Sequence, residues 1–452
     1  MQVQMADRSA SIQIRLTPVK LVILAIVGLL LIWILISWAK TFVPPTVDTK
    51  WSKPIPMENV NFLCHWNGYA VAIGRGGVFR VLNEAGQWEE KTVPGFEAEK
   101  NESCAPIIVD PHGPQAVFFD ITFSNKVQAI HSFICLTMSP QKKPLVGERI
   151  PLQKDVQHLF GEVSSSSGFK REIRFFCHEG FAETSEFYIP YSASTEDITE
   201  RITSTGTRQQ TSQAGPSQCG LFWSPDRGQS WQVMRLAQFN TAGQSAVRRA
   251  GNTFCYLAAD SAHSLWVSTR TSASSNWSQP KLLCDTLKTG DQFLTGGDKG
   301  TLHLCWMDMR LKKGLGFFIY GDWDIGRKNN QVFYRNYRDN DGQWSKEKRL
   351  SGNLSYCERP SMSVEGRRIV VVWHNLGERT PKTVTRKASP YARAAIYYAT
   401  SKDDGRTWSR PVKIKGSENS AGMYPCPKVI LHQRVIHVFY NGVYQHRDFP
   451  DG

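Results

Sequence analysis

The sequence predicts an all-β domain of repeated four-stranded sheets, joined to one membrane-spanning helix near the N-terminus. Three observations support this prediction. The 452 residues include 35 glycines, 23 prolines and 14 tryptophans, a composition typical of short strands joined by tight turns. Apolar or alternating segments recur between turn residues along most of the chain. One long apolar segment at the N-terminal end stands apart from this pattern.

The composition excludes several classes of protein. Charged residues make up 21% of the chain and aromatic residues 11%, which argues against a mostly disordered chain. The sequence has no long runs rich in Ala, Glu, Lys and Leu, so we do not expect a coiled coil or a helical solenoid. The net charge of +14 is not accompanied by a nucleic-acid-binding motif, and we expect no nucleic-acid partner.

Residues 21–38 read LVILAIVGLLLIWILISW, and Ser37 is the one clearly polar residue among them. As a helix, this segment would span roughly 27 Å, close to the thickness of a bilayer's hydrocarbon core. A cleaved signal peptide is the alternative, because residues 37–39 offer small side chains at the spacing that signal peptidase prefers. The apolar run is longer than a signal core of about 7–15 residues, so we expect an uncleaved anchor over residues 19–39.

The anchor divides the chain into a tail over residues 1–18, a tether over residues 40–58 and a domain over residues 59–452. The tether contains four prolines and is expected to be extended. Three basic residues flank each side of the anchor, so charge does not decide its orientation. A short tail before a single anchor usually places the large domain outside the cytoplasm. We therefore expect a periplasmic or extracellular domain, with the lipid bilayer as one partner.

Two eight-residue segments, 224–231 and 401–408, share the pattern Ser-x-Asp-x-Gly-x-Ser/Thr-Trp. The pattern is typical of a tight turn between two strands. The Asp accepts backbone N–H groups across the turn, the Gly takes a positive φ, and the Trp packs back onto the sheet. The residues that carry it are Ser224, Asp226, Gly228, Trp231, Ser401, Asp403, Gly405 and Trp408. Weaker copies end at Trp88, Trp277 and Trp344.

Strand-like segments surround these turns in groups of four. Five complete groups fall within about residues 104–414, while residues 428–441 supply only two strands. Residues 69–92 would supply the missing outer strands, and joining the two ends would close a ring of six sheets without open edges. A ring of seven is the alternative if residues 59–66 form a further strand.

The two turns resemble the Asp box, or BNR repeat, of the sialidase-like β-propeller superfamily, and the resemblance covers about residues 60–452. It implies a six-bladed β-propeller, with seven blades as the alternative. It implies the fold more firmly than an activity, because Asp boxes lie away from the sialidase active site and occur in many non-enzymes.

The resemblance also allows a test for enzyme activity. Sialidases use a Tyr nucleophile assisted by a Glu, an Asp acid/base and three arginines that clamp the substrate carboxylate. The matching candidates are Tyr424, Glu358 and Arg310. His374 stands where a clamp arginine would end a strand, Asn441 replaces an expected acidic residue, and an Arg-Ile-Pro motif is missing near residue 60. We therefore expect a non-catalytic member of the superfamily.

Long insertions point to a binding surface instead. Because strand direction alternates within a sheet, the Asp turns lie at one edge and the loops between second and third strands at the other. Insertions at about 181–217, 310–330 and 376–393 fall at this second edge, and loops of this length are usually functional or disordered. Residues 314–320 are apolar; they either meet a partner or fold over the domain's own mouth. The expected partner contacts are Phe317, Phe318, Ile319, Tyr320, Trp323, Arg386 and Lys387.

Metal and cofactor signatures are not found in the sequence. The ten cysteines show no metal-binding spacing, and Asp308, Asp322 and Asp324 do not complete a cation-binding pattern. Most cysteines lie in strand-like segments, whereas Cys104, Cys357 and Cys426 each precede the first strand of a repeat and could form disulfides in an oxidising compartment.

The function that the sequence favours is a non-catalytic, membrane-anchored accessory subunit that docks onto another membrane protein through its long loops. Two alternatives remain, a sialidase-type glycoside hydrolase or related lyase, and a glycan-binding module without turnover.

Overall fold

The chain divides into two units, Met1–Thr46 and Val47–Gly452. In the first unit only Leu29, which is helical and exposed, is described, so the rest of the expected anchor lies outside the described residues. Among the residues described, no helix is long and apolar enough to cross a membrane. The computed structural model describes residues 29, 47–57, 60, 62–74, 78–92, 105–110, 113–124, 128–140, 144–152, 170–177, 181–182, 186–202, 208–236, 245–260, 264–271, 276–284, 289–297, 300–308, 330–354, 357–375, 395–417, 427–440 and 442–450.

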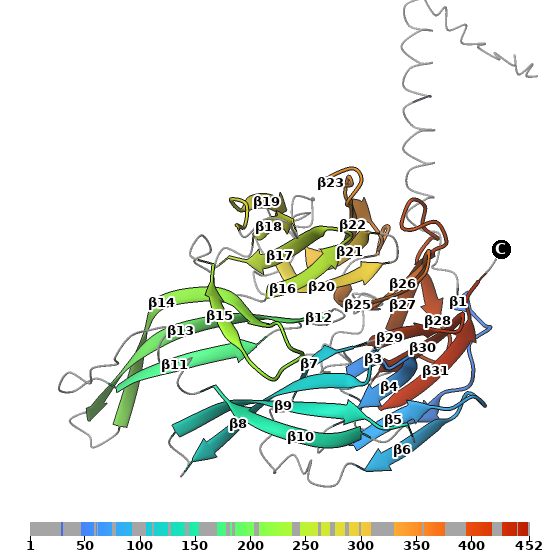
Figure 1. Ribbon diagram of the computed structural model, residues 1–452. Coiled ribbons are helices and arrows are strands. Elements are labelled where there is room, and N and C mark those ends of the chain that lie inside the picture. The colour runs from blue at the N-terminus through green and yellow to red at the C-terminus, as the bar shows by residue number, and fades with distance from the viewer. Residues whose placement is uncertain are drawn as a thin grey trace, which may run out of the picture. The chain divides into compact units, whose positions relative to one another are not determined.

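The second unit is all-β, and its described residues form seven sheets (Figure 1). The first four sheets in chain order contain β3–β6, β7–β10, β11–β15 and β16–β19. Their strands are β3 (Phe62–Trp66), β4 (Tyr69–Ile73), β5 (Val78–Leu82), β6 (Trp88–Thr92), β7 (Ala105–Val109), β8 (Gln115–Ser124), β9 (Gln128–Met138), β10 (Pro144–Pro151), β11 (Lys170–Cys177), β12 (Phe181–Ala182), β13 (Phe187–Ile202), β14 (Arg208–Ser224), β15 (Gln232–Arg235), β16 (Ser245–Ala250), β17 (Thr253–Ala259), β18 (Leu265–Thr271) and β19 (Lys281–Cys284).

The last three sheets contain β20–β24, β25–β28 and β29–β31, and the last two each add one short strand from the N-terminal segment. Their strands are β20 (Thr289–Gly297), β21 (Thr301–Asp308), β22 (Gln331–Arg338), β23 (Gln343–Trp344), β24 (Lys348–Arg349), β25 (Cys357–Glu365), β26 (Arg368–Asn375), β27 (Ala395–Ser401), β28 (Val412–Ile414), β29 (Lys428–His432), β30 (Val435–Tyr440), β31 (Val443–Asp448), β1 (Val47–Asp48) and β2 (Ile55–Pro56). Pairing is antiparallel throughout these sheets except between β1 and β28.

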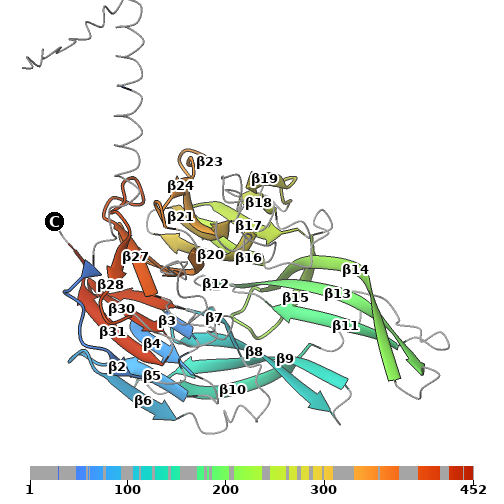
Figure 2. The ribbon, with the colours of Figure 1, turned by 180° about the vertical axis from the view of Figure 1, so that it is seen from behind.

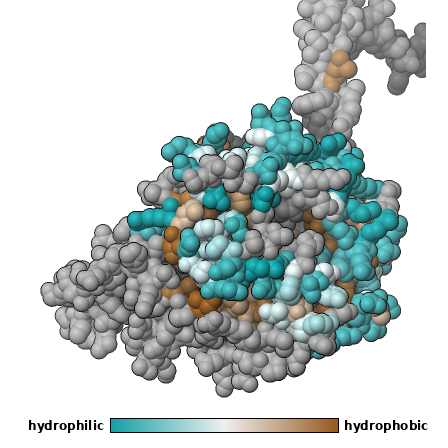
Figure 3. Space-filling view, viewed as in Figure 1, coloured by the Kyte–Doolittle hydropathy of each residue, from teal (hydrophilic) through white to brown (hydrophobic). Residues whose placement is uncertain are grey.

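Some central strands are buried along their whole length because their sheets are covered on both faces. Every residue of β17 and of β27 is buried. Apolar runs of this kind replace the polar–apolar alternation that a sheet with one solvated face would show. On the face of the molecule seen in Figure 3, the described surface is mainly hydrophilic, as expected for a domain whose apolar side chains lie between its sheets.

The seven sheets contact one another in a closed circuit, which is the arrangement of a β-propeller. One strand from each sheet carries the circuit: β3, β7, β13, β16, β20, β25 and β29 each contact the next one, and β29 contacts β3. Six of the seven seams between neighbouring sheets hold a cluster of eight or more buried apolar residues. The seam between β29–β31 and β3–β6 holds only two clusters of three. Figures 1 and 2 both show these two sheets side by side.

The structure has one sheet more than the six that the sequence predicts. Residues 69–92 do not complete the C-terminal sheet, because β3 supplies them with an inner strand of their own. The alternative of seven depended on a strand within residues 59–66, and β3 occupies Phe62–Trp66. The C-terminal sheet is completed instead by β31 and by β2 from the N-terminal segment.

Residues 47–57, which the sequence assigns to the tether, close the circuit. Ile55 pairs with Tyr444, and Ser52 accepts a hydrogen bond at its Oγ from His446 N at 3.0 Å. Nearby, the buried Asp48 carboxylate pairs with Arg447, whose Nη1 also donates to the Tyr398 hydroxyl at 2.6 Å. The two ends of the unit are therefore joined by backbone pairing and by one buried ion pair.

We expect Asp48→Ala to lower the free energy of unfolding by about 3–5 kcal/mol, because it leaves the Arg447 guanidinium buried without its counter-ion. Denaturant unfolding of the purified protein measures this. The control is Glu90→Ala, which breaks the more exposed Arg80–Glu90 pair and should cost no more than about 1 kcal/mol. Equal costs in the two variants would contradict a special role for the buried pair.

Candidate functional site

Two of the long insertions leave neighbouring sheets at adjoining edges. The segment 309–329 connects β21 to β22 where Asp308 pairs with Gln331, and the segment 376–394 connects β26 to β27 where Asn375 pairs with Ala395. Cys357 N donates to Asn330 O at 3.0 Å and so joins the two edges directly. We call this region the insertion edge and define it by Asp308, Asn330, Glu358, Arg359 and His374.

Glu358 is held in place by the neighbouring sheet. Asn330, immediately before β22, donates from Nδ2 to Glu358 Oε1 at 3.1 Å. Asn330 is only 2% exposed, and its Oδ1 has no hydrogen-bond partner among the described residues. A buried amide oxygen of this kind is costly to leave without a donor. The pair therefore combines a positioned carboxylate with a buried acceptor.

Arg359 follows Glu358 in a strained conformation. Its φ is +54°, and the register of β25 against β26 shifts between Glu358 and Ser361. A positive φ costs a side-chain-bearing residue about 1–3 kcal/mol, and bulges of this kind often lie beside functional sites, where they redirect a side chain. The bulge places one guanidinium at the start of the innermost strand.

His374 pairs with Glu358 across β25 and β26 and is 2% exposed. Burial, and then the positive charge of Arg359, lower the pKa of His374 to about 4. The imidazole is therefore neutral at pH 7, and its Nε2 has no hydrogen-bond partner in the described part of the chain. It can exchange hydrogen bonds with a neutral group but carries no charge for an anion.

Asp308 serves the fold rather than a ligand. The carboxylate is fully buried and accepts hydrogen bonds from Trp306 Nε1 at 3.3 Å and from the Cys284 thiol at 3.7 Å. Asp322 and Asp324 lie outside the described residues. Within those residues, no group of three His, Cys, Asp or Glu side chains is placed to hold a metal ion.

Only some of the other predicted site residues fall within the part of the chain that the structure describes. Glu358 lies at the insertion edge, but its proposed companions Tyr424 and Arg310 lie outside the described residues, as do all seven expected partner contacts. The sequence did not single out Asn330 as the partner of Glu358, because only the packing of two sheets brings them together. The bulge at Arg359 likewise has no local signal beyond the following proline.

The opposite edge carries the two Asp turns. In each, the Asp accepts a backbone N–H four residues on, from Ser230 to Asp226 at 2.7 Å and from Thr407 to Asp403 at 2.8 Å. Gly228 and Gly405 take φ values of +95° and +78°. Burial acts to raise the pKa of Asp403, but hydrogen bonds from Thr407 and Ser401 outweigh it and lower the pKa to about 2.

Each Asp turn also fastens its sheet to the preceding one. Trp231 packs on Phe133 of β9 with ring centroids 4.7 Å apart, and Trp408 packs on Tyr334 of β22 at the same distance. The residue before each turn glycine has a positive φ, and its side chain also contacts the preceding sheet. Arg227 binds Asp110 at 2.6 Å, and the Asp404 carboxylate lies 3.3 Å from His303.

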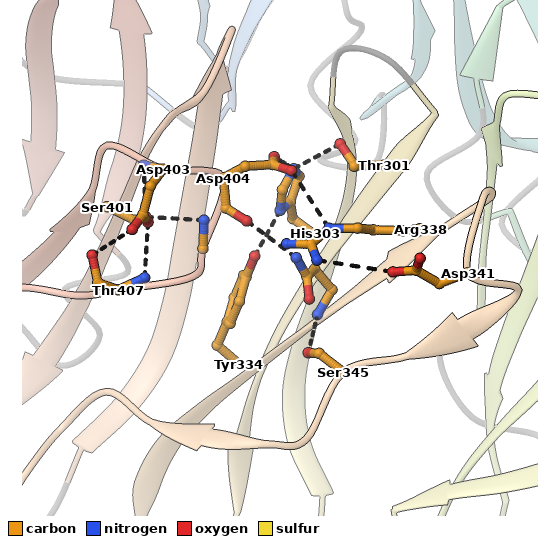
Figure 4. Close-up of polar contacts among 12 residues, drawn as sticks. Thr301, His303, Tyr334, Arg338, Asp341, Ser345, Ser401, Asp403, Asp404 and Thr407 are labelled. Atoms are coloured by element: carbon orange, nitrogen blue, oxygen red, sulfur yellow. Dashed lines mark hydrogen bonds and ion pairs between the residues drawn. The ribbon is translucent and has the colours of Figure 1, made fainter.

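Figure 4 shows the second of these contacts in detail. His303 lies between the Tyr334 hydroxyl, 2.7 Å from its Nδ1, and Asp404, 3.3 Å from its Nε2. Asn336 donates to Asp404 O at 3.1 Å, and Arg338 Nε lies 3.9 Å from the Asp404 carboxylate. The polar groups of this edge are thus engaged with one another between two sheets, so the insertion edge is the better candidate for a functional site.

None of the cysteines in the described part of the chain forms a disulfide. The eight described cysteines are thiols. Cys357, one of the three expected to be able to form a disulfide, is buried and lies 3.4 Å from Asn375 Nδ2. Burial raises the pKa of its thiol to about 12. Cys104 and Cys426 lie outside the described residues.

No protein-family model matches the chain, and no curated protein matches its sequence. Among solved structures, the WD40 domain of SCAP from fission yeast is 8% identical, with 89% of this chain and 99% of that chain covered and a TM-score of 0.38. A PL25 ulvan lyase is 10% identical, covers 90% and 95%, and has a TM-score of 0.42. A family 43 arabinoxylan arabinofuranohydrolase from Bacillus subtilis is 14% identical, covers 59% and 61%, and has a TM-score of 0.32. Likenesses of this size carry no functional argument.

Replacement of Gly405 tests how closely the second Asp turn packs against Tyr334 of the preceding sheet. A Cβ there would lie 1.9 Å from the Tyr334 hydroxyl, at a positive φ. We expect Gly405→Ala to cost about 2–5 kcal/mol of unfolding free energy, from overpacking and backbone strain together. Gly342→Ala is the matched control, because its φ is also positive but no atom lies within 4 Å; it should cost about 1–2 kcal/mol. Similar costs would show that the Tyr334 contact is unimportant.

Arg359 should contribute to the low pKa of His374. In Arg359→Gly the positive charge is lost, so the pKa of His374 should rise from about 4 while burial keeps it below about 6.5, the ordinary value. Arg359→Lys retains the charge and should leave the pKa where it is. NMR titration of selectively labelled histidine measures both. An unchanged pKa in the glycine variant would contradict the assignment of the charge effect to Arg359.

Proposed function

We propose that the protein is a non-catalytic accessory subunit of a membrane-protein assembly, built as a seven-bladed β-propeller on an N-terminal membrane anchor. In this proposal residues 19–39 span the bilayer and the propeller lies outside the cytoplasm. The partner docks on the insertion edge. The Asp turns on the opposite edge hold the propeller together, as they do in the sialidase-like superfamily that the sequence resembles.

The observation that carries the proposal is that two long insertions leave adjoining sheets side by side. The contacts of Asn330 with Cys357 and Glu358 bring their starting points together. One insertion supplies the apolar and aromatic residues 317–323, and the other supplies Arg386 and Lys387. Aromatic residues and arginines are the side chains that dominate binding energy in protein interfaces.

The polar groups of the insertion edge favour binding over turnover. Glu358 already accepts a hydrogen bond from Asn330, and His374 is neutral at pH 7. A sialidase-type reaction needs three arginines around the substrate carboxylate, and the described residues of this edge do not assemble three. This supports a docking surface that uses shape and apolar contact rather than an anion clamp.

A sialidase-type glycoside hydrolase or a glycan-binding module is the second candidate. It is favoured by one specific feature, the position of Glu358 across the ladder from His374, whose Nε2 lacks a partner among the described residues. A sugar hydroxyl is a group that a neutral imidazole and a carboxylate can both bind.

Reversal of the charge on one insertion tests the main proposal. We expect the double variant Arg386→Glu/Lys387→Glu to weaken the complex with the membrane partner at least tenfold, because it reverses two charges within the docking surface. The complex is extracted in mild detergent and its composition and stability are measured by native mass spectrometry.

The matched control is Lys402→Glu/Arg406→Glu, which reverses two exposed charges at the opposite edge and should leave the complex intact. A protein that is monomeric when extracted from its native membrane would contradict the proposal. Turnover of a fluorogenic sialoside that is lost in Tyr424→Phe would replace the proposal with the hydrolase.

A further inference from the structure

The seam that closes the ring has the least apolar packing of the seven. Its two clusters are centred on Ala70 with Ile430 and on Phe439 with Tyr444, and each contains three buried residues. Each of the other seams buries eight or more. Because hydrophobic stabilisation grows with the apolar area removed from water, this seam depends more than the others on its polar groups.

Those polar groups are mainly histidines. Four of the eleven histidines of the chain lie here, each on a different strand: His65 on β3, His432 on β29, His437 on β30 and His446 on β31. His437 and His446 are directly paired in the ladder, with ring centroids 6.2 Å apart. The rings of His65 and His432 are 5.5 Å apart across the two sheets.

His437 occupies a site that accommodates only its neutral form. Its Nδ1 lies 2.8 Å from the Tyr444 hydroxyl, and the edge of Trp88 from β6 packs against it at 6.0 Å. Its Nε2 and the Nδ1 of His446 are buried and have no hydrogen-bond partner among the described residues. Burial, and then the three other histidines, lower the pKa of His437 to about 3.

The charged surroundings offer His437 no counter-ion. The titratable groups that face it are Tyr444 and His446 from β31, His432 from β29 and His65 from β3, while β6 contributes the uncharged Trp88. Glu365 binds the backbone of residues 433 and 434 and acts on His432. The charged residues Glu84, Lys428, Arg434 and Asp448 also lie on or beside these strands, as do the pairs Arg447–Asp48, Arg80–Glu90 and Lys91–Glu89.

His303 provides the contrast within the same molecule. It is also fully buried between two sheets, but the Asp404 carboxylate lies 3.3 Å from its Nε2. A carboxylate therefore lies beside the His303 ring, whereas the groups that act on His437 are three other histidines, which would disfavour a positive charge there.

We propose that the seam between β3–β6 and β29–β31 is an acid-labile closure, which opens by protonation of its histidines as the pH falls below about 6.5, while the other six seams stay closed. The open form binds more protons than the closed form, so acid favours it. The closure is complete above pH 6.5 and weakens as the pH falls toward 3. Each pH unit raises the ratio of open to closed forms about tenfold for each histidine involved.

Opening at this seam would free β3–β6 from the C-terminal sheet. Met57 and Val60 pack in the same cluster as Phe439 and Tyr444, and Met57 N donates to Gly442 O at 2.7 Å. Acid would thus loosen the link between β2 and β3, while β1 and β2 stay paired with β28 and β31.

Hydrogen exchange of the full-length protein in detergent tests the inference at pH 7.5 and pH 5.0, after correction for the intrinsic exchange rate. We expect amide protection in β30 and β4 to fall about thirtyfold at pH 5.0, the change for one histidine over 1.5 pH units. Protection in β17, which lies in two other seams, and in β22, beside His303, should not change. Equal loss in all four strands would overturn the inference, since it would be general acid unfolding.

Removal of the titrating groups completes the test. In His437→Gln/His446→Gln the protection of β30 and β4 should fall much less than thirtyfold over this range, because glutamine retains a polar side chain that does not titrate. If this variant is unfolded at pH 7.5, His65→Gln/His432→Gln is used in its place, and a smaller fall than in the natural protein is expected. His303→Gln is the control and should retain the acid response of the seam. A thirtyfold fall that persists in the glutamine variants would overturn the proposal.

Discussion

The structure depends on the pairing of its two ends. A ring of sheets has no free edges only when the last sheet meets the first, and here that contact needs residues from both termini of the domain. The strand pair β2–β31 places the start of the domain on the last sheet, from which the chain continues into β3 of the first sheet. The buried Asp48–Arg447 pair holds that segment in place. Every other seam is made between sheets that follow one another in the chain, so its partners are close together in sequence.

The two edges of the ring differ in how their polar side chains are engaged. At the edge of the Asp turns, each turn is fastened to the preceding sheet by a tryptophan and by a polar contact, which is Arg227–Asp110 in one turn and Asp404–His303 in the other. The insertion edge also joins neighbouring sheets, through the contacts of Asn330 with Cys357 and Glu358. Arg359 has a positive φ there, as Arg227 and Asp404 have at the Asp turns. At the insertion edge, Asn330 Oδ1 and His374 Nε2 are buried without a hydrogen-bond partner among the described residues.

The sequence predicts those features of the fold that depend on residues close together in the chain. The turn geometry at Asp226 and Asp403 follows from a few neighbouring residues, and the apolar strands around them follow from periodicity. The number of sheets could not be obtained in this way. Strand β31 contains Gln445 and Arg447, both buried, whose partners Ser52 and Asp48 lie almost four hundred residues away. The contact of Asn330 with Glu358 is equally non-local, so the candidate site could be located at a strand end but not assembled.

The distance along the chain between β2 and β31 has a consequence for biosynthesis. A ribosome makes residues 47–57 almost four hundred residues before residues 443–448, so the first sheet must wait with one face uncovered while five others are completed. Contacts between such distant segments form slowly, and exposed sheet surface invites aggregation in the meantime. The period of exposure ends only when residues 443–448 have been made and the last sheet can cover the first.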